Sequence, residues 1–221
     1  MALPVVVTYN VGTGNATSIV NAAAATSSPL TLATTFMPNF PLQQRVLVTS
    51  TGNDSSLFFR IVGLNQAGFT VSEFLPGTNA TFAQSSLDYA KIVSIQGSSS
   101  STALVPSATA NTVSAGVSTT GGVGSSMWNI VNWHAMPSNI SYGCILQSNN
   151  ATFSIQYTYD DPNNLPPGVT VPTAFNHPII TNATASIDGF SNDPITAWRL
   201  TVSAGTGIIR AIGIQTGIGS P

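Results

Sequence analysis

The chain has 221 residues, and 43% of them are hydrophobic, but only 5% are Asp, Glu, Lys or Arg, against about 25% in typical soluble proteins. Its apolar content excludes a disordered chain, and its five scattered basic residues are too few for a nucleic-acid partner. A surface covered by Ser, Thr, Asn, Gly and Ala gives copies little mutual repulsion, which favours a component of an assembly.

Residues 1–28 open with a β-prone run at 5–9 and continue with Ala mixed among Ser, Thr and Asn. Because Ala favours a helix while its neighbours favour caps and turns, the Ala-rich part could be a short helix or an extended arm. We interpret the segment as an N-terminal arm. Its start lacks the basic and apolar regions of a signal peptide, and no apolar run approaches the ~18 residues of a membrane helix. The sequence therefore predicts a chain kept in a cytoplasm, with no membrane partner.

Residues 29–118 are predicted to form a β domain. Runs rich in Val, Ile and Phe are separated by Gly, Asn and Ser clusters, the pattern typical of short strands and turns. Residues 58–74 read as a hairpin with its turn at 65–68. The predicted strands are 45–49, 57–62, 69–74, 90–95 and 111–117.

The Gly- and Ser-rich stretch 119–126 is predicted to join this domain to a second β domain at 127–221, although an ordered loop inside one domain is the alternative. In the second domain Phe153, Ile155, Tyr157 and Tyr159 alternate with Ser154, Gln156 and Thr158. This period of two predicts a half-buried antiparallel strand, with the first set facing the core and the second facing solvent or a neighbour. Five prolines within 160–178 predict a long loop, and 197–202 and 208–214 predict the closing strands.

No segment of about 12 residues shows a convincing helical period. The predicted fold is therefore all-β, an antiparallel β-sandwich or jelly-roll-like arrangement of two small domains with an N-terminal arm.

Asp160 and Asp161 form the only acidic pair, and paired carboxylates bind divalent cations or do acid–base chemistry. Adjacent residues of a strand point to opposite faces, and Pro162 follows at once. We interpret the pair as a strand-ending turn, with a structural cation as the open alternative.

His134 and His177 could join Asp188 or Asp193 in a metal site, but none has the short spacing of typical ligand sets, so hydrogen-bonded structural histidines are expected. Cys144, the only cysteine, is expected to be a buried free thiol, since a catalytic thiol would need a His close in space. Gly12 and Gly14 lack the rest of a dinucleotide fingerprint. We expect no catalytic, cofactor-binding or metal residue, no cofactor and no enzyme.

The second half carries a series of motifs in a fixed order: YTYDDP at 157–162, TAFNHP at 173–178, TASIDG at 184–189, PITAWRLTV at 194–202, GTG at 205–207 and IQTG at 214–217. The series resembles the C-terminal domain of small structural proteins of tailed-bacteriophage virions, over roughly residues 127–217. The chain departs from the resemblance at 208–210 and at the bulky Trp198.

The resemblance implies a non-enzymatic virion protein, assembled in the bacterial host cytoplasm. The leading hypothesis is a capsid decoration, or cement, protein that binds the major capsid protein or neighbouring virion proteins. It would form a homo-oligomer, with a trimer favoured, and the arm 1–28 would reach an adjacent subunit. The alternatives are a neck, collar or tail fibre component, and a carbohydrate-binding β-sandwich module that stacks sugars on Trp128, Trp133 or Trp198.

Overall fold

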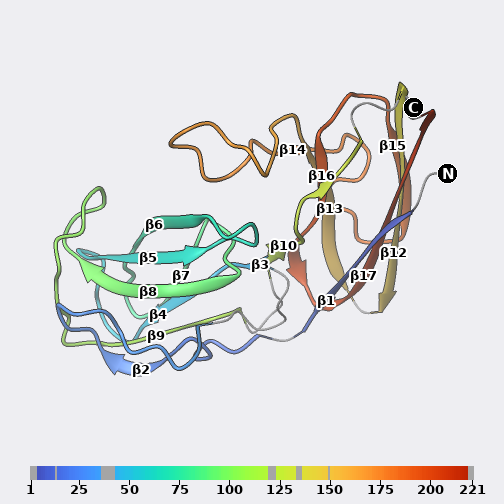
Figure 1. Ribbon diagram of the computed structural model, residues 1–221. Coiled ribbons are helices and arrows are strands. Elements are labelled where there is room, and N and C mark those ends of the chain that lie inside the picture. Colours follow the sequence, from blue (N-terminus) through green and yellow to red (C-terminus); the bar gives the residue numbers. More distant parts are fainter. Residues whose placement is uncertain are drawn as a thin grey trace. The chain divides into compact units, whose positions relative to one another are not determined.

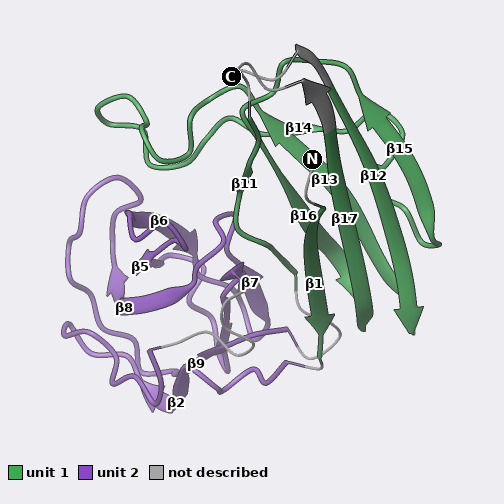
Figure 2. Ribbon diagram, turned by 45° about the vertical axis from the view of Figure 1, so that its right-hand side comes forward, with its two compact units in different colours: residues 1–12, 123–221 green, residues 13–122 purple. Residues whose placement is uncertain are grey.

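The computed structural model describes residues 4–12, 14–35, 43–118, 123–132, 136–148 and 150–218. The chain divides into two compact units: unit 1 is Met1–Gly12 with Val123–Pro221, and unit 2 is Thr13–Gly122 (Figure 2). Throughout the described ranges the regular structure is strand, without helices, and the strands pair antiparallel (Figure 1). The all-β, antiparallel sandwich-like prediction is confirmed, while its jelly-roll form stays a prediction. No helix in those ranges is long and apolar enough to span a membrane.

Unit 1 contains two sheets. In the first, the strand order is β1 (Val5–Val11), β17 (Gly207–Ile218), β12 (Met136–Ser148) and β15 (Ile187–Ser191). In the second, the order is β14 (Phe175–Asn176), β13 (Ala151–Thr158), β16 (Ala197–Gly205) and β10 (Gly124–Ser125), and β11 (Asn129–Ile130) also pairs with β16. We call the first sheet the β17 sheet and the second the β16 sheet.

The two sheets of unit 1 meet at an aromatic contact. Tyr142 on β12 lies edge-on to Trp198 on β16, with ring centroids 5.5 Å apart, and both side chains are buried. Trp198 fits because it faces Gly213 on β17, where an added Cβ would lie 2.5 Å from its ring. The bulk of Trp198, which departs from the resemblance, is thus accommodated by a glycine on the opposite sheet.

The alternating run in β13 is only partly half-buried as predicted. Phe153 and Ile155 are fully buried, but Tyr157 is half-buried and Tyr159 is exposed. The prediction that Ser154 and Thr158 face solvent or a neighbour is wrong, since both are buried, and of the polar set only Gln156 is half-exposed.

Loops explain the burial of the two hydroxyls. The Asn182 backbone N–H donates to Ser154 Oγ at 2.9 Å, and the Asp160 N–H donates to Thr158 Oγ1 at 3.1 Å. Segments that follow β13 in the chain therefore fold back over the outer side of the strand and cover it there.

Unit 2 also contains two sheets. One has the order β2 (Val20–Ala24), β9 (Thr112–Gly116), β4 (Leu47–Ser50) and β7 (Phe82–Gln84), and the other has β6 (Thr70–Pro76), β5 (Phe58–Leu64) and β8 (Lys91–Ser98). The short β3 (Gln43–Gln44) places Gln44 in a bridge with the buried Tyr89. The predicted hairpin is confirmed: β5 pairs with β6, and Gly68, at φ 84°, closes the turn by donating to the Asn65 carbonyl at 3.1 Å.

The structure divides the N-terminal segment differently from the predicted arm, residues 1–28. β1 pairs with β17 from Val5↔Gly213 to Val11↔Gly207, and β2 pairs with β9 in unit 2. β1 and β2 are thus edge strands of the chain's own sheets rather than a detached arm.

The unit boundaries also differ from the predicted domains 29–118 and 127–221, because unit 1 takes in the N-terminus and unit 2 starts at Thr13. Of the predicted joint 119–126, residues 119–122 lie outside the described residues, and Gly124–Ser125 form β10.

The core of unit 1 makes the first testable prediction. Ile155→Ala should lower the free energy of unfolding by about 2–5 kcal/mol, because it leaves a cavity at a fully buried position. Gln156→Ala, one residue along the same strand, should cost less than about 1 kcal/mol. All three tryptophans lie in unit 1, so tryptophan fluorescence during urea unfolding reports on this unit. Equal losses at both positions would contradict the observed register.

Candidate functional site

The outer face of the β17 sheet is unusually apolar. Alternate residues of its strands pack into the core, among them Tyr142, Ile209 and Ala211, so the residues between them point outward. The outward side of such a sheet normally carries polar residues. Here, beside the exposed polar residues Thr8, Asn10 and Ser141, it also carries exposed apolar side chains. These are Val6, Ile145, Phe190 and Ile214, which retain 47%, 40%, 60% and 40% of their accessible surface.

The register places these side chains around a glycine. Gly143 on β12 lies opposite Ile212 on β17 and Asp188 on β15, and two residues along, Ser141 lies between Ile214 and Phe190. An added Cβ at Gly143 would have no atom within 4 Å. The result is an open hollow of about 380 Å³, lined by Ser141, Tyr142, Gly143, Asp188, Gly189, Phe190, Ile212 and Ile214.

Two opposite charges share this face with the apolar side chains. Asp188 lies beside Gly143, and Arg210 lies opposite Ile145 on β17. Two strands and two residues separate them, which puts their Cα atoms about 12 Å apart at about 4.8 Å per strand and 3.4 Å per residue. Within the described part of the chain, neither side chain has a hydrogen bond or an ion pair. We call this whole surface, from β1 to β15, the Gly143 face.

The ionisable groups beneath this face are unsuited to acid–base chemistry. Burial raises the pKa of Tyr142 well above its usual range, and a nearby Asp193 carboxylate raises it further. The Tyr142 hydroxyl is buried and has no hydrogen-bond partner among the described atoms. Burial likewise raises the pKa of the Cys144 thiol to about 12, so the thiolate that a nucleophile requires is scarce at neutral pH. Cys144 is confirmed as a buried free thiol.

His177 is confirmed as a hydrogen-bonded structural residue. Its Nδ1 accepts hydrogen bonds from the backbone N–H groups of Ile179 and Ile180 at 3.2 and 3.1 Å. The proton must therefore sit on Nε2, which donates to the Phe190 carbonyl at 3.1 Å. The buried ring thus ties the loop after β14 to β15. His134 lies outside the described residues, and within them no group of three His, Cys, Asp or Glu side chains could hold a metal ion.

The acidic pair is a turn, as predicted. The Asp161 carboxylate accepts the Asn163 backbone N–H at 3.0 Å, which is an Asx turn, and the Asp160 carboxylate accepts the Thr173 N–H at 2.6 Å. The two side chains thus fix the two ends of the loop that follows β13. That loop is interrupted by the two-residue strand β14, which the prolines had not led us to expect.

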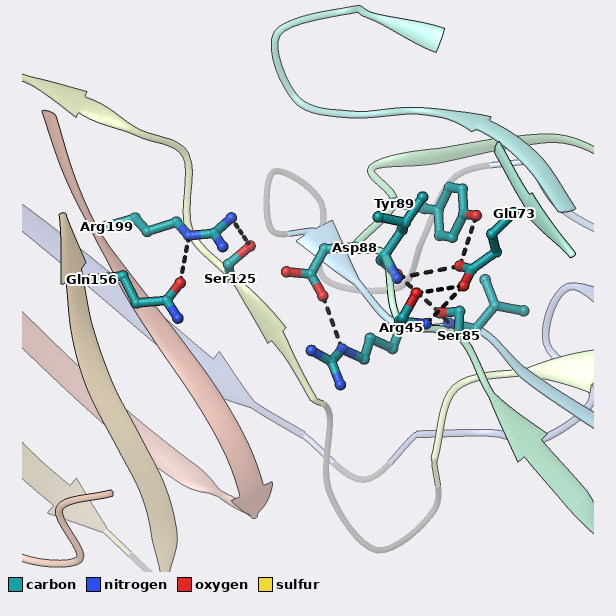
Figure 3. A network of polar contacts seen from close by, with 11 residues as sticks. Arg45, Glu73, Ser85, Asp88, Tyr89, Ser125, Gln156 and Arg199 are labelled. Carbon is teal, nitrogen blue, oxygen red and sulfur yellow. Dashed lines mark hydrogen bonds and ion pairs between the residues drawn. The ribbon is translucent and has the colours of Figure 1, made fainter. Parts of the chain in front are cut away.

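Trp198 does not offer the predicted stacking face. Trp198 is 1% exposed, so it cannot stack on a sugar, and Trp133 lies outside the described residues. The Arg199 guanidinium lies 4.5 Å from the centroid of Trp128. Figure 3 shows Arg199 held between Gln156, at 3.0 Å, and Ser125, at 3.2 Å.

An aromatic cluster that sequence reasoning missed lies at the β13–β14 edge of the β16 sheet. Tyr157, Tyr159 and Phe175 have ring centroids 5.6–5.8 Å apart, and Tyr159 and Phe175 are exposed. Phe175 joins the cluster because β14 pairs with β13 and places it opposite Tyr157. The two tyrosines could be seen in the sequence, but their partner 16 residues further on could not.

In unit 2 the charged side chains serve the fold. Glu73 accepts hydrogen bonds from the Tyr89 hydroxyl at 2.9 Å and from Ser86, and Arg45 pairs with Asp88 at 3.3 Å (Figure 3). These carboxylates fasten the segment between β7 and β8 to neighbouring strands. They therefore have structural partners, whereas Asp188 and Arg210 on the Gly143 face have none among the residues that the structure describes.

Asp54 of unit 2 is buried and holds a turn. Its carboxylate accepts hydrogen bonds from Ser50 Oγ at 2.5 Å, Thr109 Oγ1 at 2.5 Å and Asn111 Nδ2 at 2.7 Å. Burial raises the pKa of this carboxyl, but the three hydrogen bonds lower it by more, so the net pKa lies below its usual range.

Comparison with known proteins found no matching family model, no matching curated protein and no matching solved structure.

Asp54 should make the stability of unit 2 depend on acid pH. A pKa that is lower in the folded chain means that ionised Asp54 contributes stability above its unfolded pKa of about 3.9, and that this is lost as the pH falls through the folded pKa. Asp54→Asn should remove that part of the pH dependence. Hydrogen exchange of the β4 and β9 amides at neutral and acid pH measures it, and parallel curves for both proteins would contradict the assignment.

Two glycines of the β17 sheet should respond oppositely to the same substitution. Gly213→Ala should cost about 1–3 kcal/mol, because its Cβ would collide with the buried Trp198 ring. Gly143→Ala should change stability by less than about 0.5 kcal/mol, because its Cβ would enter open space. Urea unfolding followed by tryptophan fluorescence checks both, and an equal cost would mean that the Gly143 face is not open.

Proposed function

We propose that this chain is a non-enzymatic structural protein of a tailed-bacteriophage virion that decorates the head shell and reinforces it. The observation that carries the proposal is the Gly143 face, an exposed apolar sheet surface on a chain with only 5% charged residues. Contiguous exposed apolar patches on soluble proteins are typical of surfaces that contact other macromolecules.

The energetics favour an assembly component. Covering apolar surface contributes roughly 25 cal/mol per Å², so the four exposed side chains on this face gain free energy only when another molecule packs on them. With five basic and seven acidic residues in the whole chain, little charge repulsion opposes that packing. In a shell, many such contacts act together, so modest individual contacts suffice.

The uses of the chemically capable side chains also support a structural role. Glu73, Asp160, Asp161 and His177 each hold loops or strands through hydrogen bonds to neighbouring groups. The buried Cys144 has a raised pKa. Such assignments leave these groups committed to the fold rather than available to a substrate.

The proposed partners are the major capsid protein or neighbouring virion proteins, with assembly in the bacterial host cytoplasm. A neck, collar or tail fibre position would use the same kind of apolar contact, so we rank it second. The resemblance of the unit 1 motifs does not distinguish head, neck and tail proteins. We prefer the head because decoration uses many copies of a small protein.

One observation favours a second function, carbohydrate binding. The aromatic cluster of Tyr157, Tyr159 and Phe175 is adjacent to the amide pair Gln156 and Asn176, which are joined by a hydrogen bond of 2.9 Å. Exposed aromatic rings beside amides suit stacking on a sugar ring. This function would be supported if the wild type binds a glycan array, Tyr159→Ala loses that binding and Phe82→Ala keeps it. Phe82 is the control because it is another exposed aromatic residue.

The virion proposal predicts where the protein is found. In particles of the phage that encodes it, mass spectrometry of separated heads and tails should detect the chain in the head fraction at many copies. Adding purified protein to heads that lack it should raise the temperature at which the heads release DNA. Detection only in tails would favour the second-ranked position, and absence from particles would contradict a virion role.

A further inference from the structure

We propose that the Gly143 face is the contact between two copies of this chain, packed face to face about a two-fold axis. The inference rests on the proposed function, since it names the partner of the surface that carries it. Three features of the face point to a second copy as the occupant: its two charges, its hollow and its apolar side chains.

The charges are self-complementary. Asp188 and Arg210 lie about 12 Å apart on the face, too far to pair within one copy. Consider a two-fold axis that lies between the two stacked sheets. It passes midway between Asp188 and Arg210 and runs perpendicular to the line that joins them, so it places each residue opposite the other residue of the second copy. Asp188 then faces Arg210 of the partner subunit, and the second pair forms by symmetry. The chain has only twelve charged residues, five basic and seven acidic, so one of each sign on an apolar face is unusual.

The same axis fills the hollow. Taking about 4.8 Å between strands and 3.4 Å per residue, the operation that pairs Asp188 with Arg210 brings Ile212 of the partner subunit over Gly143. The absence of a side chain at Gly143 leaves room for that isoleucine, between Phe190 and Ile214. The two-fold axis that pairs the charges is therefore the same axis that fills the hollow.

A surface that packs on itself makes an isologous contact, which closes at two copies. The trimer favoured from head symmetry would need another surface, so the inference replaces it with a two-fold pair. Each sheet would be buried on both sides, as the run of apolar residues in β17 already suggests.

The experiment measures the mass of the purified full chain by sedimentation equilibrium over a dilution series. The wild type should approach the mass of two 22.8 kDa chains at the upper concentrations. Asp188→Arg and Arg210→Asp each place like charges opposite one another twice, so each should weaken the dimer by at least about tenfold. The double swap, Asp188→Arg with Arg210→Asp, re-creates both pairs and should bring the dissociation constant back to within about threefold of the wild type.

A matched pair of phenylalanines tests the apolar part. Phe190 on the Gly143 face and Phe82 in unit 2 are 60% and 58% exposed. Phe190→Ser should weaken the dimer by at least about tenfold, whereas Phe82→Ser should leave it unchanged. Gly143→Leu, which fills the hollow without meeting its own chain at Cβ, should weaken it as well. Melting curves that match the wild type show that each variant is folded.

Several outcomes would overturn the inference. They are a wild-type mass of one chain at all concentrations, a mass of three chains, or a dimer that survives the single charge changes. A double swap that fails to restore association would also overturn it, since a partner of another kind would not be repaired by changes on this chain. A monomer that still binds heads would contradict the dimer and remain consistent with a virion role. A dimer that is absent from particles would contradict the virion role and remain consistent with the dimer.

Discussion

The packing of Trp198 against Gly213 and Tyr142 is the constraint on which the rest of unit 1 depends. Side chains alternate along a strand, so burying Tyr142 and turning Gly213 towards the tryptophan fixes which residues of β12 and β17 point out. Gly143, Ile212 and Ile214 face outward for that reason. The His177 bond to the Phe190 carbonyl holds β15 in place beside them. The aromatic contact in the core therefore determines which side chains of β12 and β17 lie on the outer face of the sheet.

Local features of the fold could be predicted from sequence, and long-range ones could not. The 65–68 turn and the Asp161 turn depend on residues within four positions of one another, so their chemistry is visible in a short window. The pairing of β1 with β17 joins segments about 200 residues apart, and nothing in the segment 5–11 names its partner. The burial of Ser154 depends in the same way on Asn182, from a loop that crosses the strand later in the chain.

The candidate site was missed for a related reason, although one signal was present. The Gly143 face combines β1, β17, β12 and β15, which lie in four separate parts of the sequence. Within β17, however, Ile208, Ile209, Ile212 and Ile214 place apolar side chains on both faces. A largely apolar run is typical of a strand covered on both sides, yet among the described residues only one side of β17 is covered. The sequence of β17 thus suits a strand buried on both faces, and the exposure of its outer face is the signal that points to a contact surface.

Because the chain has so few charged side chains, the role of each one can be considered separately. Asp54, Glu73 and Asp88 each bind groups of unit 2, where a hydrogen-bonded carboxylate fixes a loop that few apolar contacts could hold. Among the described residues of unit 1, Asp188 and Arg210 have no hydrogen bond or ion pair. At an apolar contact, charges of this kind add little net affinity, because removing them from water offsets their attraction. Their effect is on orientation: the apolar side chains would allow several ways of stacking two sheets, and only those that bring opposite charges together avoid leaving an ion buried without a partner.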